Sequence, residues 1–487
     1  MDALIGRDIE GASLRTWDVL VVGGGIYGAT LALEASQRGL ATLLLERGDF
    51  GGATTWNSLR IVHGGLRYLQ RLDFSRFRES VRERGWFLRN FPDLVASLPC
   101  LMPLYDPPRG GALRRPAVFR RVLEINDLLT SRWSPGPEGS RPGRVLDAEQ
   151  TAALFPGVDR EGLRGGALWY DAVMPDSHRV LIEILRWASS SGAQALNYVE
   201  AVDLRVERGR VAGLSAVDHS SGRGFELRGR AVVNCAGPWC RPLARRFDRD
   251  LPALFRPVLG FNLFLDRDPF SRMALAVTSR EPKAQTWFLL PWKGRLLAGT
   301  AYVAAASGLG EEEEPQEAQV ESFLRSLNAA VPGFAVRRSE VLRVHRGRLP
   351  AMKEGSALPA VRPVVYDHGR SGGPAGLVSV SGVKLTAARA VAEKVLALLP
   401  RHGLTVRSRE PVARPAADAP LSLDYLLQLA ERDPGAARAH VCGLAARQSV
   451  VRLDDLLLRR TDWGMLPARV PEAARLCESL GWLEGAA

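Results

Sequence analysis

The sequence predicts an α/β protein in which an N-terminal βαβ unit is joined to a strand-rich cap domain and a small C-terminal helical domain. A strand, a glycine-rich turn and a helix follow one another near the N-terminus. Residues 250–340 are rich in strand signals, and residues 400–420 have the Pro, Ala and Arg content of a linker. The 487 residues suffice for about three domains, or for two with a discontinuous layout.

The N-terminal unit begins with a β-branched apolar run at 18–22, which is typical of a fully buried parallel strand. This run leads directly into the glycine-rich turn 23–28. Residues 29–38 have helix-forming composition, and a second apolar run at 41–45 predicts another buried strand that ends at Glu46. Strand, glycines, helix, strand and terminal acid are therefore all in register.

Each part of this unit has a physical task in binding a dinucleotide. Gly23 permits the tight turn, Gly25 lets backbone N–H groups approach a pyrophosphate, and Gly28 lets the helix pack closely on the strand. The helix N-terminus adds partial positive charge, and Glu46 accepts hydrogen bonds from the adenosine ribose hydroxyls. The unit is of the Rossmann type, and its acid argues against NADP but leaves NAD and FAD open.

The chain is basic, because Lys and Arg exceed Asp and Glu by 12. This excess favours anionic partners such as a phosphorylated substrate, an acidic membrane surface or a nucleic acid. Genomic base composition would enrich arginine equally well. None of the common nucleic-acid-binding sequence motifs occurs, so no nucleic-acid partner is predicted.

The five cysteines are scattered and never form a CxxC pair, so neither a disulfide framework nor a metal site is predicted. We expect reduced, mostly buried thiols. No apolar stretch is long enough for a transmembrane helix, and no secretory signal is recognised at the first residues. A cytoplasmic location is expected by default.

The stretch 49–69, which contains His63-Gly-Gly65, resembles the flavin-proximal segment of FAD-dependent glycerol-3-phosphate dehydrogenases, in the D-amino-acid-oxidase-like superfamily. The resemblance continues in order along nearly the whole chain. The further similar segments are 168–171, 231–239, 288–292 with Gly299-Thr300, 376–389 and 453–461. It implies a Rossmann-type FAD-binding domain with an antiparallel β-rich cap domain and a small C-terminal helical domain.

The resemblance implies FAD as the cofactor and assigns residues to it. Hydroxyls at 54–58 would face the pyrophosphate, the glycines after His63 would bring backbone close to the isoalloxazine ring, and a helix at 385–399 would aim its positive N-terminus at the flavin N1–C2=O edge. The expected FAD-binding residues are Gly23, Gly25, Gly28, Glu46, Arg47, Thr54, Thr55, Ser58, His63, Gly64, Val202, Ala236, Gly237, Gly382, Lys384, Leu385 and Thr386.

The implied reaction is hydride transfer from C2–H of sn-glycerol 3-phosphate to flavin, which yields dihydroxyacetone phosphate, with a quinone or similar acceptor reoxidising the flavin. Arg348, with Arg346 as a second candidate, and Lys384 are expected to hold the phosphate. His63 or His345 is the candidate base for the hydroxyl proton. Another oxidase or dehydrogenase of the superfamily, acting on a 2-hydroxy acid or an amine, remains the alternative; a third is a flavin-binding protein with reduced catalysis.

Four positions depart from the family pattern in segments near substrate or flavin. Asn57 replaces the arginine of a Ser-Ser-Arg-Ser run, and Val383 replaces a glycine before the lysine. Asn262 ends a segment that reads Lys-Gly-Ser-His in the family, and Ala301 lies in its Gly-Thr-Thr-Asp-Thr segment. The exact substrate, phosphorylated or carboxylated, therefore stays open.

Two segments, 74–91 and 114–123, are both basic and amphipathic. Such stripes either pack in a core or contact a membrane. Family members commonly lie on the inner membrane face, which implies peripheral contact there. The expected domains are an FAD-binding domain at 1–75, 145–245 and 340–400, a substrate and cap domain at 76–144 and 246–339, a linker at 401–420 and a helical domain at 421–487.

Overall fold

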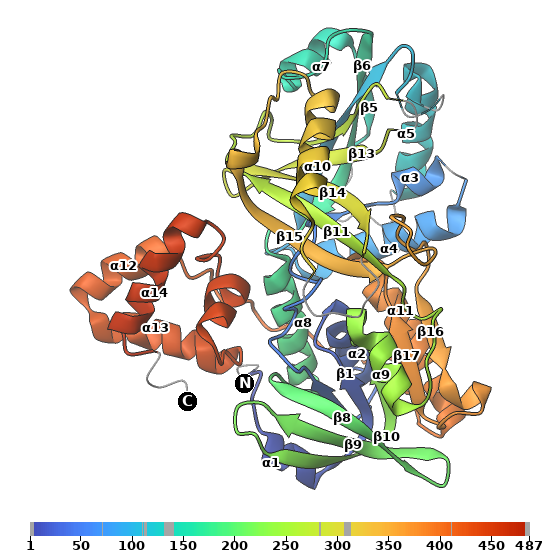
Figure 1. The fold of residues 1–487 in the computed structure, drawn as a ribbon, viewed down its shortest axis with the longest axis vertical. Coiled ribbons are helices and arrows are strands. Elements are labelled where there is room, and N and C mark those ends of the chain that lie inside the picture. The colour runs from blue at the N-terminus through green and yellow to red at the C-terminus, as the bar shows by residue number, and fades with distance from the viewer. Residues whose placement is uncertain are drawn as a thin grey trace.

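The computed structural model describes residues 4–70, 72–109, 111, 114–130, 141–281, 284–305, 313–410 and 412–482. Two sheets follow one another along the long axis of the molecule, and a group of C-terminal helices lies against one side (Figure 1). The predicted α/β class with a helical C-terminal part is confirmed.

The first sheet contains the predicted nucleotide-binding unit. Strand β1 pairs in parallel with β2 on one side and β10 on the other, and β10 pairs in parallel with β17. The register places Val22 beside Leu45 and Asn234, so the carboxyl ends of the three strands lie together. In sheet order the strands are β16 (Val364–Asp367), β17 (Leu377–Ser381), β10 (Gly224–Asn234), β1 (Thr16–Val22), β2 (Thr42–Leu45) and β7 (Gln194–Leu196), with β9 (Arg210–Asp218) and β8 (Val199–Glu207) attached to β10 as an antiparallel extension.

Side chains of β1 alternate between the two faces of this sheet. Val19 and Val21 pack in the core under α2 (Ile26–Ser36), α8 (Ser177–Ser190) and α11 (Ala388–Leu396). Leu20 and Val22 pack on the other face, against α1 (Ile9–Leu14) and the β8–β9 hairpin. Burial on both faces explains why residues 19–22 of this strand are all apolar.

Residues 250–340 contribute β11, β12, β13 and β14 to the second sheet. Strands β11, β13 and β14 pair antiparallel, while β12 meets β4 in parallel. Helix α10 (Glu317–Ala330) packs on one face of the sheet. In sheet order the strands are β15 (Val341–Pro350), β11 (Pro257–Leu265), β14 (Arg295–Ala304), β13 (Thr286–Trp292), β12 (Ala274–Thr278), β4 (Ala96–Tyr105), β6 (Leu163–Val173) and β3 (Ile61–Val62), and β5 (Arg144–Leu146) pairs with β6.

Three strands that fall in the range expected for the FAD-binding domain pair with the second sheet instead of the first. Strands β3, β6 and β15 fall within the ranges 1–75, 145–245 and 340–400, yet all three belong to the second sheet. Their apolar patterns predict strands but carry no information about the partner strand, which depends on distant residues. The division into domains itself stays a prediction.

The two basic amphipathic segments form helices. In α4 (Phe74–Asn90) the apolar residues Phe77, Val81 and Phe87 are buried, so this stripe belongs to the core. Helix α5 (Pro116–Thr130) buries Phe119 and Leu123 but leaves a second apolar face exposed. No helix in the described ranges is long and apolar enough to cross a membrane.

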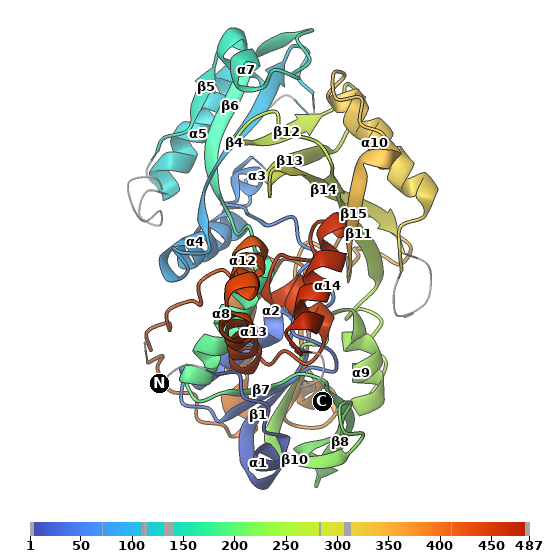
Figure 2. The ribbon, with the colours of Figure 1, turned by 90° about the vertical axis from the view of Figure 1, so that its left-hand side faces the viewer.

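The C-terminal helices form a small lobe with its own apolar core. They lie over α8 and α2, on the side that faces the viewer in Figure 2. The elements are α12 (Leu423–Arg432), α13 (Pro434–Arg447), a π-helix η7 (Asp455–Arg460), a 3-10 turn η8 (Pro467–Arg469) and α14 (Val470–Ser479). All five cysteines are free, and four of them are buried, as predicted.

Candidate functional site

A cavity of about 1500 Å³ opens at the carboxyl ends of β1, β2 and β10 and reaches the second sheet. Pockets for small ligands usually measure about 300–1,000 Å³, so this one has room for a dinucleotide and a substrate. It brings together most of the predicted residues: Gly23, Gly25, Glu46, Arg47, Thr54, Thr55, Ser58, His63, Ala236, Gly237, Arg348, Gly382, Lys384, Leu385 and Thr386. Four others, Gly28, Gly64, Val202 and His345, lie outside its lining.

The glycine turn has the geometry that the motif predicts. Gly23 has φ +110°, and a Cβ there would lie 2.5 Å from the carbonyl oxygen of Cys235. A Cβ on Gly28 would overlap the carbonyl oxygen of Gly23, so this glycine serves the packing of α2 against the turn. Gly25 is the N-cap of α2, where the positive end of the helix favours an anion.

Glu46 lies at the end of β2 and is held by backbone hydrogen bonds. Its carboxylate accepts from the N–H of Gly24 at 2.6 Å and from the N–H of Gly48 at 2.9 Å. Burial raises the pKa of Glu46 above its ordinary value, although these two hydrogen bonds act in the opposite direction. The two hydrogen bonds thereby fix the orientation of the carboxylate in the cavity wall.

The far end of the cavity is formed by β8 and by the turn after β10. Here the structure differs from the prediction of Val202: the lining residues are Tyr198, Val199, Glu200 and Ala201. Val202 lies at an irregularity in the β8–β9 pairing, and its carbonyl accepts from Arg246 at 3.2 Å. A one-residue irregularity in a strand is not visible in the sequence.

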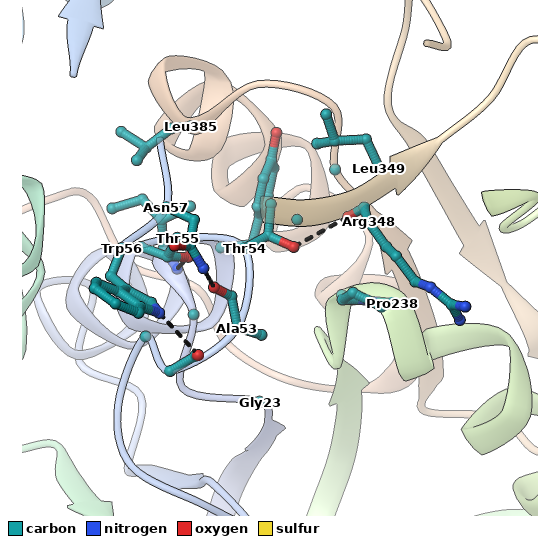
Figure 3. A pocket seen from close by; sticks show the side chains of 18 of the residues that line it. Gly23, Ala53, Thr54, Thr55, Trp56, Asn57, Pro238, Arg348, Leu349 and Leu385 are labelled. Atoms are coloured by element: carbon teal, nitrogen blue, oxygen red, sulfur yellow. Dashed lines mark hydrogen bonds between the residues drawn. The ribbon is translucent and has the colours of Figure 1, made fainter. Parts of the chain in front are cut away.

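The three predicted hydroxyls have different partners. Thr55 accepts a hydrogen bond from the N–H of Ile26 in the first turn of α2, at 3.1 Å. Thr54 donates to the carbonyl of Arg348 at 3.0 Å, a bond drawn in Figure 3. Ser58 donates to the hydroxyl of Ser177 at 3.2 Å. Thr55 is thus the hydroxyl placed at the anion-binding end of α2.

His63 is held by a buried carboxylate that the sequence analysis did not assign to the site. Its Nδ1 lies 3.1 Å from Asp171 Oδ2, and the N–H of Gly64 donates to Asp171 Oδ1 at 2.7 Å. Burial would raise the pKa of Asp171, but the hydrogen bond and charge of His63, with the charge of Arg84, bring that pKa below its usual value. Asp171 therefore fixes Nδ1 as the protonated nitrogen and leaves Nε2 as an acceptor.

Lys384 precedes a 3-10 turn, η5 (Leu385–Ala387), so the predicted α-helix begins at Ala388 instead of Leu385. The backbone of Lys384 is fixed by Tyr27, whose hydroxyl donates to the Lys384 carbonyl at 2.6 Å. The Lys384 ammonium contacts the Tyr68 hydroxyl and lies 4.3 Å from the centre of that ring. Lys384 lines the cavity, and its ammonium lies beside Tyr68, in the segment after His63.

The β15 residues divide between two faces of the strand, as alternation requires. A Cβ on Gly347 would lie 2.7 Å from Cγ2 of Thr54, so the face with His345 and Gly347 looks toward segment 54–57. Arg348 lies on the other face and pairs with Glu313 at 2.8 Å. Figure 3 shows Arg348 and Leu385, the neighbour of Lys384, on different sides of Thr54.

His345 is fully buried between the rings of Trp56 and Trp292 and lies outside the cavity lining. Burial lowers its pKa well below the ordinary value. Its Nδ1 lies 3.2 Å from the amide oxygen of Asn57. The ring is therefore neutral and does not line the cavity. His63 does line it, so His63 is the better placed of the two candidate bases.

Two of the departures from the family pattern meet in one network. The Asn262 side chain donates to the carbonyl of Asn57 at 2.9 Å and accepts from the hydroxyl of Thr300 at 2.8 Å. Asn57 itself donates to the carbonyl of Ala53 at 3.0 Å (Figure 3). The Asn57, Asn262 and Thr300 side chains of this network are uncharged and hydrogen-bonded.

The arrangement combines a dinucleotide site with an oriented histidine and a lysine in one cavity. The glycine turn and Glu46 suit the ADP half of a dinucleotide, and His63 with Asp171 suits proton abstraction. Lys384 suits an anionic group. These elements are typical of a redox enzyme that oxidises a small alcohol or amine.

Comparisons with known proteins agree. Residues 18–398 match the model of the FAD dependent oxidoreductase family. The chain is 30% identical to glycerol-3-phosphate dehydrogenase 1 of Mycobacterium tuberculosis, with 92% of each chain covered. It is 26% identical to aerobic glycerol-3-phosphate dehydrogenase of Bacillus subtilis, with 81% of this chain and 68% of the relative covered.

Two solved structures share the fold. The glycerol-3-phosphate dehydrogenase from Bacillus halodurans complexed with FAD superposes with a TM-score of 0.71 at 21% identity, covering 97% of this chain and 92% of that one. The L-alpha-glycerophosphate oxidase from Mycoplasma pneumoniae with FAD bound gives 0.59 at 15% identity, covering 84% and 100%. The protein is therefore an FAD-dependent oxidoreductase and belongs to the FAD-dependent glycerol-3-phosphate dehydrogenase family.

Proposed function

We propose that the protein oxidises sn-glycerol 3-phosphate, or a close analogue, to dihydroxyacetone phosphate. The observation that carries this proposal is the pairing of His63 with Asp171 in the same cavity as Lys384. Relatives that bear the name glycerol-3-phosphate dehydrogenase support the choice of substrate.

The residues present fit FAD. A side chain on Gly25 would lie 3.3 Å from the Thr55 hydroxyl and would fill the space above the N-terminus of α2. Glu46 would accept from the ribose, and the backbone at Ala236 and Gly237 would line the opposite side of the cofactor. FAD, when bound, accepts the hydride that leaves the substrate carbon.

The chain's own part in the chemistry is to hold the substrate and move one proton. Nε2 of His63 accepts the hydroxyl proton as the C–H bond breaks, because Nδ1 is engaged by Asp171. The imidazolium that forms is stabilised by the same carboxylate. The expected product is a ketone, since the alcohol carbon loses both its hydrogen and its hydroxyl proton.

Lys384 and Arg348 are the proposed cations for the substrate phosphate. Lys384 lines the cavity, and its ammonium contacts the Tyr68 hydroxyl. Arg348 approaches from a different side and pairs with Glu313. Single substitutions at the two positions will therefore separate their contributions.

The proposal is tested by anaerobic reduction of the purified holoenzyme, followed as loss of flavin absorbance. We expect sn-glycerol 3-phosphate to reduce the flavin, and glycerol to do so far more slowly because it lacks the anionic group. Reduction by a 2-hydroxy acid or an amine, but not by glycerol 3-phosphate, would overturn the substrate assignment and support the alternative.

We also propose that a quinone reoxidises the flavin and that α5 contacts the membrane that contains it. Leu128 is 76% exposed and Ile125 47% exposed on this helix, beside the exposed Arg120 and Arg121. Apolar side chains among arginines suit an anionic lipid surface. In liposome flotation at low salt, Leu128→Glu should weaken binding, whereas Val206→Glu, an exposed apolar site on β8, should not. No binding by the unaltered protein would refute the contact.

A further inference from the structure

The C-terminal helical lobe reaches the wall of the cofactor cavity. Arg452 and Arg459 line the same cavity as Glu46 and Gly48. The match to the FAD dependent oxidoreductase family ends at residue 398, so both arginines lie beyond that match, and Arg459 lies in the segment 453–461 that resembles glycerol-3-phosphate dehydrogenases. Arg459 lies on the π-helix η7. Such helices are rare in proteins, and those that occur are often found at functional sites.

A buried ion-pair network ties the lobe to the loop after β2. Asp49 is only 5% exposed and accepts from Arg460 at 2.6 and 2.8 Å and from Arg459 Nε at 2.5 Å. Burial would raise the pKa of Asp49, but the charges and hydrogen bonds of the two arginines bring that pKa below its usual value. Asp49 follows Glu46 by three residues, so this network anchors the loop that carries the ribose ligand.

The start of β8 belongs to the same network. The Tyr198 hydroxyl donates to Asp455 Oδ1 at 2.7 Å, and its backbone N–H donates to the carbonyl of Gly48 at 2.9 Å. Asn197 donates to Asp49 at 3.1 Å and to the carbonyl of Ser449 at 2.7 Å. The lobe, the Glu46 loop and the wall at Tyr198 are thus joined by hydrogen bonds.

Arg452 has a different position from the paired arginines. Its guanidinium lies 4.6 Å from the centre of the Tyr198 ring and is exposed in the cavity wall. No acidic side chain in the described part of the chain pairs with it. Stacking on a ring restrains the guanidinium while leaving its donors available, which suits a phosphate or ribose oxygen.

We propose that the C-terminal lobe is part of the FAD site, with Arg452 contacting the ADP half of the cofactor and Arg460 positioning Glu46 through Asp49. The inference rests on FAD binding and not on the identity of the substrate. Because the lobe contributes to the site, FAD binding and docking of the lobe favour each other.

The test uses the full chain, from which FAD is removed and then restored. Arg452→Ala should raise the FAD dissociation constant about tenfold or more, as expected for loss of a charged hydrogen bond. Arg452→Lys should raise it less. Arg438→Ala, an exposed arginine of α13 away from the cavity, is the matched control and should stay within about twofold of the unaltered protein.

Competition by ADP identifies the half of FAD that is contacted. The affinity for ADP should fall with Arg452→Ala by the same factor as the affinity for FAD. Equal FAD dissociation constants for the Arg452→Ala and Arg438→Ala proteins would overturn the proposal. Neither titration contains substrate, so a wrong substrate assignment would leave both results unchanged.

Tryptic cleavage of the linker at 401–420 provides a second readout. FAD should slow this cleavage in the unaltered protein, because it favours the docked lobe, and should slow it less in Arg452→Ala. Cleavage at the same rate with and without FAD in the unaltered protein would contradict the coupling.

Discussion

Replacing Asp171 by asparagine tests the role of the His63 pair most directly. Three donors point at the carboxylate: His63 Nδ1 at 3.1 Å, the N–H of Gly64 at 2.7 Å and the indole N–H of Trp169 at 3.2 Å. Asparagine offers one oxygen, which we expect the shortest bond, from Gly64, to retain. Its amide nitrogen then faces Nδ1 and forces the proton of His63 onto Nε2.

The expected loss of rate in flavin reduction follows from this change of tautomer. A histidine with a protonated Nε2 cannot accept the substrate hydroxyl proton, and a positioned general base contributes about 10²–10⁴ in rate. We therefore expect flavin reduction to slow by about 10²–10⁴, or about 3–5 kcal/mol in activation free energy. The KM should change little, since the anionic end of the substrate is held elsewhere.

The rate is measured by anaerobic stopped-flow reduction of the bound flavin with sn-glycerol 3-phosphate. Asp159→Asn is the control, because Asp159 also has a lowered pKa and accepts from Arg109 and Arg280, but lies outside the cavity lining. It should reduce flavin at the unaltered rate. An Asp171→Asn protein that keeps its FAD and reduces it within threefold of that rate would refute the role of the pair.

Three further predictions concern substrate, cofactor and stability. Lys384→Met should raise the KM for the anionic substrate about tenfold or more. Glu313→Gln removes a carboxylate from the cavity wall and should lower this KM. Both KM values are measured by steady-state kinetics at constant ionic strength. Gly28→Ala should lower the melting temperature even without FAD, because its Cβ overlaps backbone, while Gly25→Ala should fold normally and bind FAD weakly. His178 is fully buried, and burial lowers its pKa to about 3. The unfolded chain therefore binds a proton first, and the free energy of unfolding should fall below about pH 6.5 by up to about 1.4 kcal/mol per pH unit. Urea unfolding at several pH values should show a smaller dependence in His178→Gln, with the contribution of the buried His345 remaining; an unchanged slope would contradict it.

The nucleotide-binding unit could be predicted from sequence because its signals are local. Gly23, Gly25 and Gly28 and the strand before them act within one turn of backbone, and Glu46 follows at a spacing set by a single helix and strand. Each element is specified by residues close to it in the chain. The structure accordingly contains the strand, turn, helix and strand in the predicted order, with the helix at Ile26–Ser36 instead of 29–38.

The remainder of the site depends on contacts between distant segments. Asp171 becomes a partner of His63 only when β3 pairs with β6, and Arg452 reaches Tyr198 only when the C-terminal lobe docks. On β15 the sequence shows His345 and Arg348 three residues apart, but not that His345 is buried outside the cavity lining while Arg348 lies within it. A one-residue change of face decides whether a side chain lies in a site or in a core.

The hydrogen bond between Asn57 and His345 accounts for the uncharged side chain at position 57, and it affects which residues can bind an anionic substrate. A guanidinium at position 57, as in the family pattern, would lie against the buried ring of His345, whose pKa is already lowered by burial and by nearby arginines. The neutral amide instead accepts from that ring at 3.2 Å, and Asn262 and Thr300 complete an uncharged hydrogen-bonded network. Positive charge for an anionic substrate must then come from elsewhere in the cavity, which is why Lys384 is expected to contribute more here than it would beside an arginine at 57.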